Sequence, residues 1–340
     1  MKEIAHLAGV SIGTVDRVLH HRGRVSAENV ARINAIVAER GYRPNVFASS
    51  LSGGSVLRTI AVLIPQPDQD YGYWRLIWNG MERAAKELEP LQVAVKIEGF
   101  DRNSPDACSR AFQSVMADGC QALALAPIHN RVLRPLVEAL PPSFPLVFFD
   151  TDMECSHSRC FVGQDPWEGG ALAGKLLGLT LEPGRPVVLV RFDEDDEHLQ
   201  KRSEGFEAYA KASGRQVLVL EQKLADPLQR RRADTSLFLA QHPAAGGLFV
   251  PNASVGEFAQ AGLGRRVVGY DLIPGNITAL REGRLDFLLS QRPELMGYEA
   301  VRRLSRVLLF REPLPGRIGL PLDIIVKENL DGHLEGSDPV

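Results

Sequence analysis

Residues 14–24 contain three arginines and a threonine whose side chains can bind the phosphates and bases of a nucleic acid. Arg17 falls in the second of three short expected helices, where it can reach a guanine or a phosphate. Thr14, Arg22 and Arg24 are better suited to phosphate, where contacts position a protein without reading base sequence. This cluster therefore predicts a DNA-contacting segment near the N-terminus.

The residues before and within that segment have the types that a helix-turn-helix requires. Ala5 is small enough to let two helices approach, Gly9 accepts the left-handed backbone of a tight turn, and Val15 locks the second helix onto the first. Ser11 is a good N-cap for the second helix. The outer face of that helix is expected to enter a major groove. Besides Thr14 and Arg17, it carries Ser11, Ile12, Gly13 and Asp16.

A third helix is expected from Ser26 to Gly41, with Val30, Ile33 and Val37 facing inward. Residues 1–58 carry eight Lys or Arg and four Asp or Glu, a net charge of +4, whereas the whole chain carries −3. A basic head on an acidic body favours a polyanionic partner. By spacing alone, a small helical cap that binds no nucleic acid is the alternative.

The overall composition is that of a water-soluble globular protein. The 340 residues are 44% hydrophobic and 24% charged, and no apolar run approaches the ~18 residues of a membrane span. The N-terminal residues MKEIAHLAGV do not resemble a secretory signal. We therefore expect a cytoplasmic protein without a membrane partner, and its four cysteines are expected to be reduced, buried or half-buried thiols.

From residue 59, short apolar runs such as TIAVLIP, VAVKI, ALALAP and LVFFD alternate with helical stretches such as 74–89, 105–118 and 130–140. This alternation predicts parallel sheets with helices on both faces. About ten strands are too many for one comfortable sheet, so two lobes are expected. The predicted fold is an all-α helix-turn-helix head followed by a two-lobed α/β domain.

The segment IAHLAGVSIGTVDRVLHHRGRVS closely resembles the DNA-binding head of the LacI-type (lactose-repressor) family. The match runs from Ile4 to Leu19 and includes the small residue, the turn glycine and the apolar lock described above. Asp16 stands where the family usually has serine, and His20 stands where it usually has asparagine. The chain also begins a few residues later than most relatives, so the first helix is expected to lack its usual Thr or Ser cap.

The family's hinge is also matched, by Pro44, Asn45, Ala48 and Leu51. The resemblance implies that this segment becomes helical on operator DNA and that Leu51 wedges into the minor groove. Such hinges meet in pairs, which implies a homodimer and a pseudo-palindromic operator. An interdomain linker with an incidental leucine is the alternative.

Residues 60–330 resemble the family's effector domain, which has the two-lobed, type I fold of periplasmic sugar-binding proteins. The resemblance implies that the lobes close on a carbohydrate at the carboxyl ends of their strands. Tyr73 or Trp74 would stack on a sugar ring, and Arg202 would make bidentate bonds to hydroxyls or to a carboxylate. The remaining predicted ligand-binding residues end strands or lie in the segment that returns to the first lobe: Asp150, Asn252, Asp271 and Gln291.

Each of these residues also has a purely structural interpretation, either as an aromatic residue packing the next helix or as a polar residue ending a strand. Ala253 departs from the aspartate that usually follows the family's asparagine. Gly169 to Lys175 match the start of a phosphate-binding loop, but Leu176 lacks the hydroxyl that would hold magnesium, and we interpret these glycines as part of a helix capped by Asp165. Arg230 to Arg232 are interpreted as an exposed helix face.

The predicted domains are a head at 1–44, a hinge and linker at 45–58, a first lobe at 59–161 with 292–320, and a second lobe at 162–291 with 321–340. The predicted function is a DNA-binding transcriptional regulator, in particular a repressor, whose operator affinity is controlled by a small ligand in the cleft. The alternative is a sugar-binding protein of a transport system. An enzyme is not expected, because the sequence has no nucleophile elbow, complete phosphate loop or dinucleotide fingerprint, and no cofactor or metal is expected.

Overall fold

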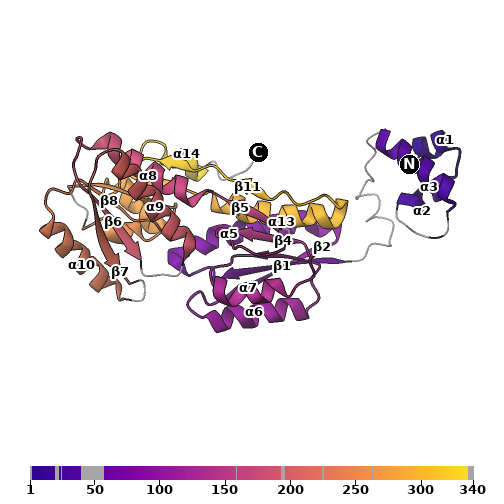
Figure 1. The fold of residues 1–340 in the computed structure, drawn as a ribbon, viewed down its shortest axis with the longest axis horizontal. Helices are drawn as coiled ribbons and strands as arrows, with labels where there is room; N and C mark the ends of the chain where they lie inside the picture. The colour runs from indigo at the N-terminus through magenta and orange to yellow at the C-terminus, as the bar shows by residue number, and fades with distance from the viewer. Residues whose placement is uncertain are drawn as a thin grey trace. The chain divides into compact units, whose positions relative to one another are not determined.

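The computed structural model describes residues 2–19, 23, 25–39, 57–157, 159–192, 196–223, 226–261 and 264–335. The chain divides into two compact units between Leu57 and Arg58. Among the described residues, the first unit holds three helices and the second holds two six-stranded sheets (Figure 1).

The first unit is a bundle of the helices α1 (Lys2–Ala8), α2 (Ile12–Leu19) and α3 (Ala27–Glu39). Its core consists of apolar side chains at helical spacing, which makes one face of each helix apolar. Val30 and Val37, which we expected to face inward, are partly buried at its edge. The fully buried members are Ile4, Ala5, Ala8, Val15, Val18 and Ile33.

The turn between α1 and α2 has the predicted chemistry. Gly9 adopts a φ of 64°, in the left-handed region that favours glycine. The Ser11 Oγ accepts a hydrogen bond from the Thr14 backbone N–H at 3.1 Å, which caps the N-terminus of α2. Arg32 of α3 donates to the Ala8 carbonyl at 3.3 Å and so joins α3 to the end of α1.

In the part of the chain that the structure describes, the second unit contains twelve strands in two sheets. The first sheet has the order β11-β5-β4-β3-β1-β2 and the second has the order β12-β10-β9-β8-β6-β7. All neighbouring strands are parallel except β10 and β12. The strands of the first sheet are β1 (Arg58–Pro65), β2 (Val93–Phe100), β3 (Ala122–Leu125), β4 (Leu146–Phe149), β5 (Arg159–Gly163) and β11 (Arg317–Gly319). Those of the second are β6 (Val187–Phe192), β7 (Val217–Gln222), β8 (Gly247–Phe249), β9 (Arg266–Tyr270), β10 (Phe287–Ser290) and β12 (Asp323–Ile325).

Helices cover both faces of each sheet, as the strand and helix alternation predicts (Figure 1). On the first sheet, α6 (Pro105–Ala117) and α7 (Asn130–Glu138) pack on one face, while α5 (Tyr73–Leu88) and α13 (Pro293–Phe310) pack on the other. On the second sheet, α8 (Pro166–Thr180) and α9 (Glu197–Ala212) share one face. The remaining elements are α10 (Leu228–Gln241), α11 (Val255–Phe258), α12 (Pro274–Arg281) and α14 (Leu330–Glu335) on the other face, with the short helices η1 (Asp70–Gly72) and η2 (Glu89–Leu91) beside α5.

Alternation along β6 shows how one strand serves both layers. Val187 and Leu189 pack with α8 and α9, whereas Val188 and Val190 pack with the helices on the opposite face. Successive side chains of a strand point to opposite faces, so a run of apolar residues is buried on both sides.

Each lobe contains one very close crossing of two helices, and glycine makes it possible. A Cβ on Gly80 of α5 would overlap the Glu294 carbonyl oxygen of α13, and a Cβ on Gly170 of α8 would overlap the Arg202 carbonyl oxygen of α9. Asp165 caps α8 by accepting from the backbone N–H groups of Trp167 and Glu168 at 2.9 and 3.2 Å. The glycines of the apparent phosphate loop therefore serve helix packing.

The first sheet takes its strands from residues 58–163 and 317–319, and the second takes its strands from residues 187–290 and 323–325. β5 continues to Gly163, because Val162 still pairs with Phe149 and Gly163 with Gly319. The crossover from the first lobe to the second thus falls two residues beyond the predicted boundary at 161.

The cysteines are buried or half-buried free thiols, as expected. Within the described ranges, no helix combines the length and the apolar composition that crossing a bilayer requires.

Candidate functional site

The outer face of α2 presents the residues expected to contact DNA. Ser11, Ile12, Gly13 and Arg17 are exposed, whereas Thr14 and Asp16 are half-buried. Ile12 is 45% exposed although it is apolar, which suits a side chain that packs against a partner. The Ser11 and Thr14 hydroxyls lie 2.9 Å apart at the N-terminus of the helix.

Five predicted DNA contacts fall outside the described residues and stay predictions. These are Arg22, Arg24, Asn45, Ala48 and Leu51.

All seven predicted ligand-binding residues line one cavity between the two lobes of the second unit. The cavity is small, about 40 Å³, because side chains from both lobes meet across it. The seven residues lie at or just beyond the carboxyl ends of the strands or in the helices that follow, as expected for a doubly wound sheet. The seven are Tyr73, Trp74, Asp150, Arg202, Asn252, Asp271 and Gln291.

Arg202, Gln291 and Asp271 form a buried chain of hydrogen bonds. The Arg202 Nη2 donates to the Gln291 Oε1 at 2.6 Å, and the Gln291 Nε2 donates to the Asp271 Oδ2 at 3.0 Å. The Arg202 Nη1 donates to the Pro251 carbonyl at 2.7 Å, and the guanidinium lies 3.9 Å from the centre of the Tyr270 ring. Among the described residues, no hydrogen-bond partner reaches two buried atoms of this network, the Arg202 Nε and the Asp271 Oδ1. Such atoms are costly unless a ligand or water completes them.

Burial raises the pKa of Asp271 to about 6, although the Arg202 charge opposes that shift. The neighbouring Asp150 carboxylate adds to it. The Tyr73 hydroxyl donates to the Asp150 Oδ1 at 2.5 Å, and burial followed by the Asp150 charge raises the pKa of Tyr73 well above its usual value. Tyr73 is therefore a neutral hydrogen-bond donor at neutral pH.

The two aromatic residues are more buried than a simple stacking platform would be. Trp74 is 2% exposed and Tyr73 is 6% exposed, and their rings meet edge to face at 5.3 Å. The Trp74 Nε1 donates to the Asp70 Oδ2 at 2.7 Å. Both side chains thus shape the cavity through their polar atoms as well as their rings.

Asn252 uses its side-chain oxygen within its own loop, where it accepts from the Ser254 N–H at 3.0 Å and from the Ser254 Oγ at 2.6 Å. Its Oδ1 therefore orders the strand end after β8.

A second polar network lines the cavity and was missed from the sequence. The Arg102 Nε lies 2.7 Å from the Asp70 Oδ2, and its Nη2 lies 3.6 Å from the Asp196 Oδ2 of the other lobe. The His198 Nδ1 lies 2.6 Å from the Asp196 Oδ1 and 2.9 Å from the Thr151 Oγ1. Despite its burial, the Asp196 pKa is lowered to about 2 by His198, followed by Arg102. The sequence signal that could have revealed this network is Arg102, which lies two residues after the end of β2.

A third contact joins the lobes and corrects a prediction. Arg231, expected on an exposed helix face, is buried, and its Nη2 donates to the Tyr71 hydroxyl of the first lobe at 3.0 Å. Its guanidinium also lies 3.4 Å from the Glu257 carboxylate. Arg230 is exposed as expected, with a 67% exposed side chain. The prediction for Arg231 was wrong because a run of like charges does not reveal which member faces inward.

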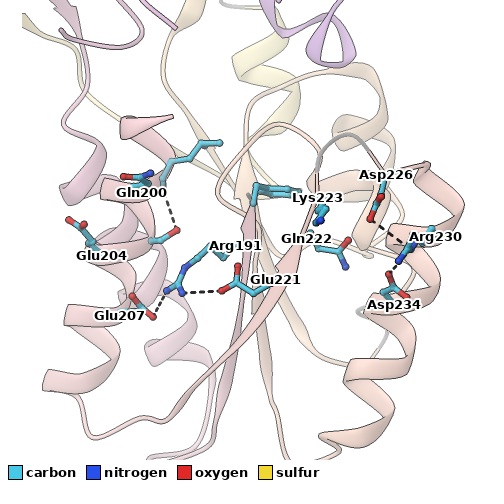
Figure 2. Close-up of a pocket in the computed structure, with 13 residues that line it drawn as sticks. Arg191, Gln200, Glu204, Glu207, Glu221, Gln222, Lys223, Asp226, Arg230 and Asp234 are labelled. Atoms are coloured by element: carbon cyan, nitrogen blue, oxygen red, sulfur yellow. Dashed lines mark hydrogen bonds and ion pairs between the residues drawn. The ribbon is translucent and has the colours of Figure 1, made fainter. Parts of the chain in front are cut away.

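A larger cavity of about 810 Å³ lies between α9 and α10 in the second lobe (Figure 2). Six of its charged side chains pair with one another, since Arg191 contacts Glu207 and Glu221 while Arg230 contacts Asp226 and Asp234. None of the seven predicted ligand residues lines it.

Two families match the chain. Residues 1–45 match the profile of bacterial regulatory proteins of the lacI family, and residues 60–312 match that of the periplasmic binding protein domain.

Curated relatives match at moderate identity. The sucrose operon repressor of Streptococcus mutans is 27% identical over 183 residues, covering 52% of this chain and 51% of the relative. The catabolite repressor/activator of Escherichia coli is 30% identical, covering 52% of each chain. The matched part therefore spans about half the length of these relatives.

Solved structures show the same fold as the second unit. A candidate LacI transcriptional regulator from Bacteroides fragilis has a TM-score of 0.74 at 22% identity, covering 82% of this chain and 99% of that one. A glucose-galactose binding protein from Geobacillus stearothermophilus has a TM-score of 0.70 at 22% identity, covering 81% and 99%. The chain belongs to the periplasmic binding protein domain family through residues 60–312, and its residues 1–45 match the lacI family of bacterial regulatory proteins.

Proposed function

We propose that this protein is a transcriptional regulator, in particular a repressor, that binds operator DNA through α2 and a sugar or sugar derivative in the cavity between its lobes. One observation carries the proposal. A helix-turn-helix with an exposed second helix stands in the same chain as a two-lobed domain whose seven predicted ligand residues meet in one cavity.

The polar groups of the cavity suit hydroxyl groups. The carboxylates of Asp150 and Asp271 accept hydrogen bonds. In the described part of the chain, the Arg202 Nε can still donate a hydrogen bond to a ligand and the Asp271 Oδ1 can still accept one. A sugar hydroxyl both donates and accepts, so it can complete a carboxylate and a guanidinium together. The names of the relatives, a sucrose operon repressor and a catabolite repressor/activator, favour a role in carbohydrate-controlled transcription.

The mechanism follows from two states of the second unit. Ligand binding favours the closed arrangement of the lobes, and closure changes how two protomers of a homodimer present their DNA-binding heads. The ligand can shift this equilibrium only by its differential affinity for the two states. We propose a homodimer in the cytoplasm, a pseudo-palindromic operator and no catalytic step.

The experiment is a competition of labelled promoter-region DNA against random duplex, followed by fluorescence anisotropy with the full chain. The proposal predicts preferential binding of the promoter DNA that weakens steeply with salt, because each neutralised phosphate releases counterions. A folded protein that binds both duplexes equally at every salt concentration would instead favour the transport-protein alternative.

A further inference from the structure

We infer that the cavity between the lobes takes an uncharged polyhydroxylated ligand and rejects sugar phosphates and sugar acids, with Asp70 as a specificity determinant. This inference rests on the proposed function and names the chemical class of its effector. It is argued from how the two arginines of the cavity are already engaged.

The first arginine, Arg102, is neutralised by carboxylates from both lobes. Its guanidinium lies 2.7 Å from Asp70 and 3.6 Å from Asp196, and its side chain is 13% exposed. An anionic ligand would have to displace one of these carboxylates from a buried pair. Arg102 is therefore poorly available to a phosphate or carboxylate of the ligand.

The second arginine, Arg202, is held by acceptors of the protein itself. Its Nη1 donates to the Pro251 carbonyl and its Nη2 to Gln291, while the Tyr270 ring covers one face of the guanidinium. The bidentate grip on a ligand carboxylate that the sequence suggested would need these terminal nitrogens. Within the part of the chain that the structure describes, only the Arg202 Nε lacks a hydrogen-bond partner, and a single N–H suits a hydroxyl oxygen.

Negative charge predominates in the lining. Three carboxylates face two guanidinium groups there, and the Asp271 Oδ1 is a buried acceptor without a donor. A ligand anion would lie beside these carboxylates at low dielectric, whereas a hydroxyl group can donate to the free oxygen. The carboxylates are Asp70, Asp150 and Asp271, and the guanidinium groups are Arg102 and Arg202.

The start of α9, which is a natural place for an anion, is already filled. The Asp196 Oδ1 accepts from the His198 backbone N–H at 3.3 Å and so caps the helix beside the cavity. A helix N-terminus attracts a ligand anion through its free N–H groups and its dipole, and here a carboxylate of the protein occupies that position.

The test uses isothermal titration calorimetry of the full chain with matched pairs of ligands, each a neutral monosaccharide and its phosphate or uronic acid. We expect the tightest ligand to be neutral and its anionic partner to bind at least about tenfold more weakly. An anionic sugar that binds more tightly than its neutral partner would overturn the inference but leave a sugar-controlled regulator intact. If no member of any pair binds while promoter DNA is still selected, both the inference and the sugar effector are wrong.

Asp70→Asn tests the specificity determinant. Asparagine tolerates the left-handed backbone at this position, where φ is 49°, and can still accept from the Trp74 Nε1. Removing the charge leaves Arg102 less neutralised, so the affinity of the anionic partner relative to the neutral sugar should rise several-fold. Asp118→Asn, which removes an exposed carboxylate paired with Lys96 outside the cavity, should leave the ratio unchanged. An unchanged ratio in Asp70→Asn, with neutral-sugar binding retained, would contradict the role of Asp70.

Discussion

Asp150 and Asp271 occupy equivalent places in the two lobes. Each directly follows the third strand of its sheet, β4 and β9 respectively, and each has a φ of 66°. A left-handed backbone is uncommon for aspartate and is retained mainly where the surrounding structure imposes it. The two strand ends thus bring two carboxylates to one cavity, where a ligand hydroxyl can satisfy them.

The Asp271 carboxylate should make stability depend on pH. Its pKa is raised to about 6 by burial, so the unfolded chain loses this proton at lower pH than the folded protein does. The ionised form therefore opposes folding, and its contribution to stability falls as the pH rises from about 4 to about 6. Asp271→Asn removes this effect. Its free energy of unfolding relative to the wild type should rise by up to about 3 kcal/mol between pH 4 and pH 7 in urea titrations without ligand. A difference that is the same at both pH values would contradict this environment for Asp271.

The Tyr71 hydroxyl should stabilise the closed arrangement of the lobes through Arg231. Tyr71→Phe removes a hydrogen bond to a charged partner, which contributes about 1.5–3 kcal/mol when buried and less here because Tyr71 is 41% exposed. We expect the radius of gyration of the ligand-free protein to increase in small-angle X-ray scattering and sugar affinity to fall several-fold. Tyr298→Phe is the matched control, because its hydroxyl bonds to Glu87 within one lobe. Equal effects of both variants would show that the interlobe contact has no special role.

Arg17 should contribute to operator binding from the exposed face of α2. Arg17→Ala should weaken binding by about 1–3 kcal/mol if the side chain reads a base, or reduce the salt slope by about one if it contacts phosphate. Fluorescence anisotropy at several salt concentrations separates the two outcomes. Arg110→Ala removes the same charge from an exposed position on α6 and should change neither quantity. If Arg17→Ala bound with wild-type affinity and slope, α2 would not be the recognition helix.

Gly170 should be required for the close crossing of α8 and α9 that positions Arg202. Gly170→Ala would place a Cβ against the Arg202 carbonyl and within 2.9 Å of the Phe206 nitrogen, both backbone atoms. We expect a loss of about 1–3 kcal/mol in stability by urea unfolding, as for other overpacked sites, and weaker sugar binding. Gly178→Ala on the same helix would meet only ordinary contact at 3.5 Å from Tyr209 and should be neutral or stabilising. A Gly170→Ala variant as stable as Gly178→Ala would show that the crossing can adjust.

The hydrophobic patterns of the sequence predicted most of the strands, because the burial of a strand sets its own local composition. Nine of the apolar runs from TIAVLIP onward form strands, since a continuous apolar run bounded by turns is what a doubly buried parallel strand requires. Strand β10 was not among those runs. The short strands β11 and β12 were not recognised either. They contain few fully buried residues, and pairing at a sheet edge stabilises them more than composition does.

Site residues that lie at strand ends were predicted from the sequence. Site residues that are positioned by a partner in the other lobe were missed. Asp150 and Asp271 follow strands directly and Asn252 lies three residues beyond β8, so their position at the sheet edge can be read from the chain. Arg102, Asp196 and Arg231 acquire their roles from partners far along the chain, and no local pattern specifies those partners. The resemblance implied that Arg202 binds a ligand hydroxyl or carboxylate, but it did not predict the Pro251 and Gln291 acceptors that already engage the guanidinium.

The most direct test of the account is the coupling between the cavity and the DNA-binding head. The affinity of the full chain for its own promoter-region DNA should be measured by anisotropy without sugar and at a saturating concentration of the sugar that binds most tightly. If the sugar controls operator binding, the DNA dissociation constant should change roughly 5- to 150-fold, and sugar affinity should change by the same factor when operator DNA is present. If a sugar that fills the cavity left promoter affinity unchanged, the cavity would not control DNA binding and the account would be wrong.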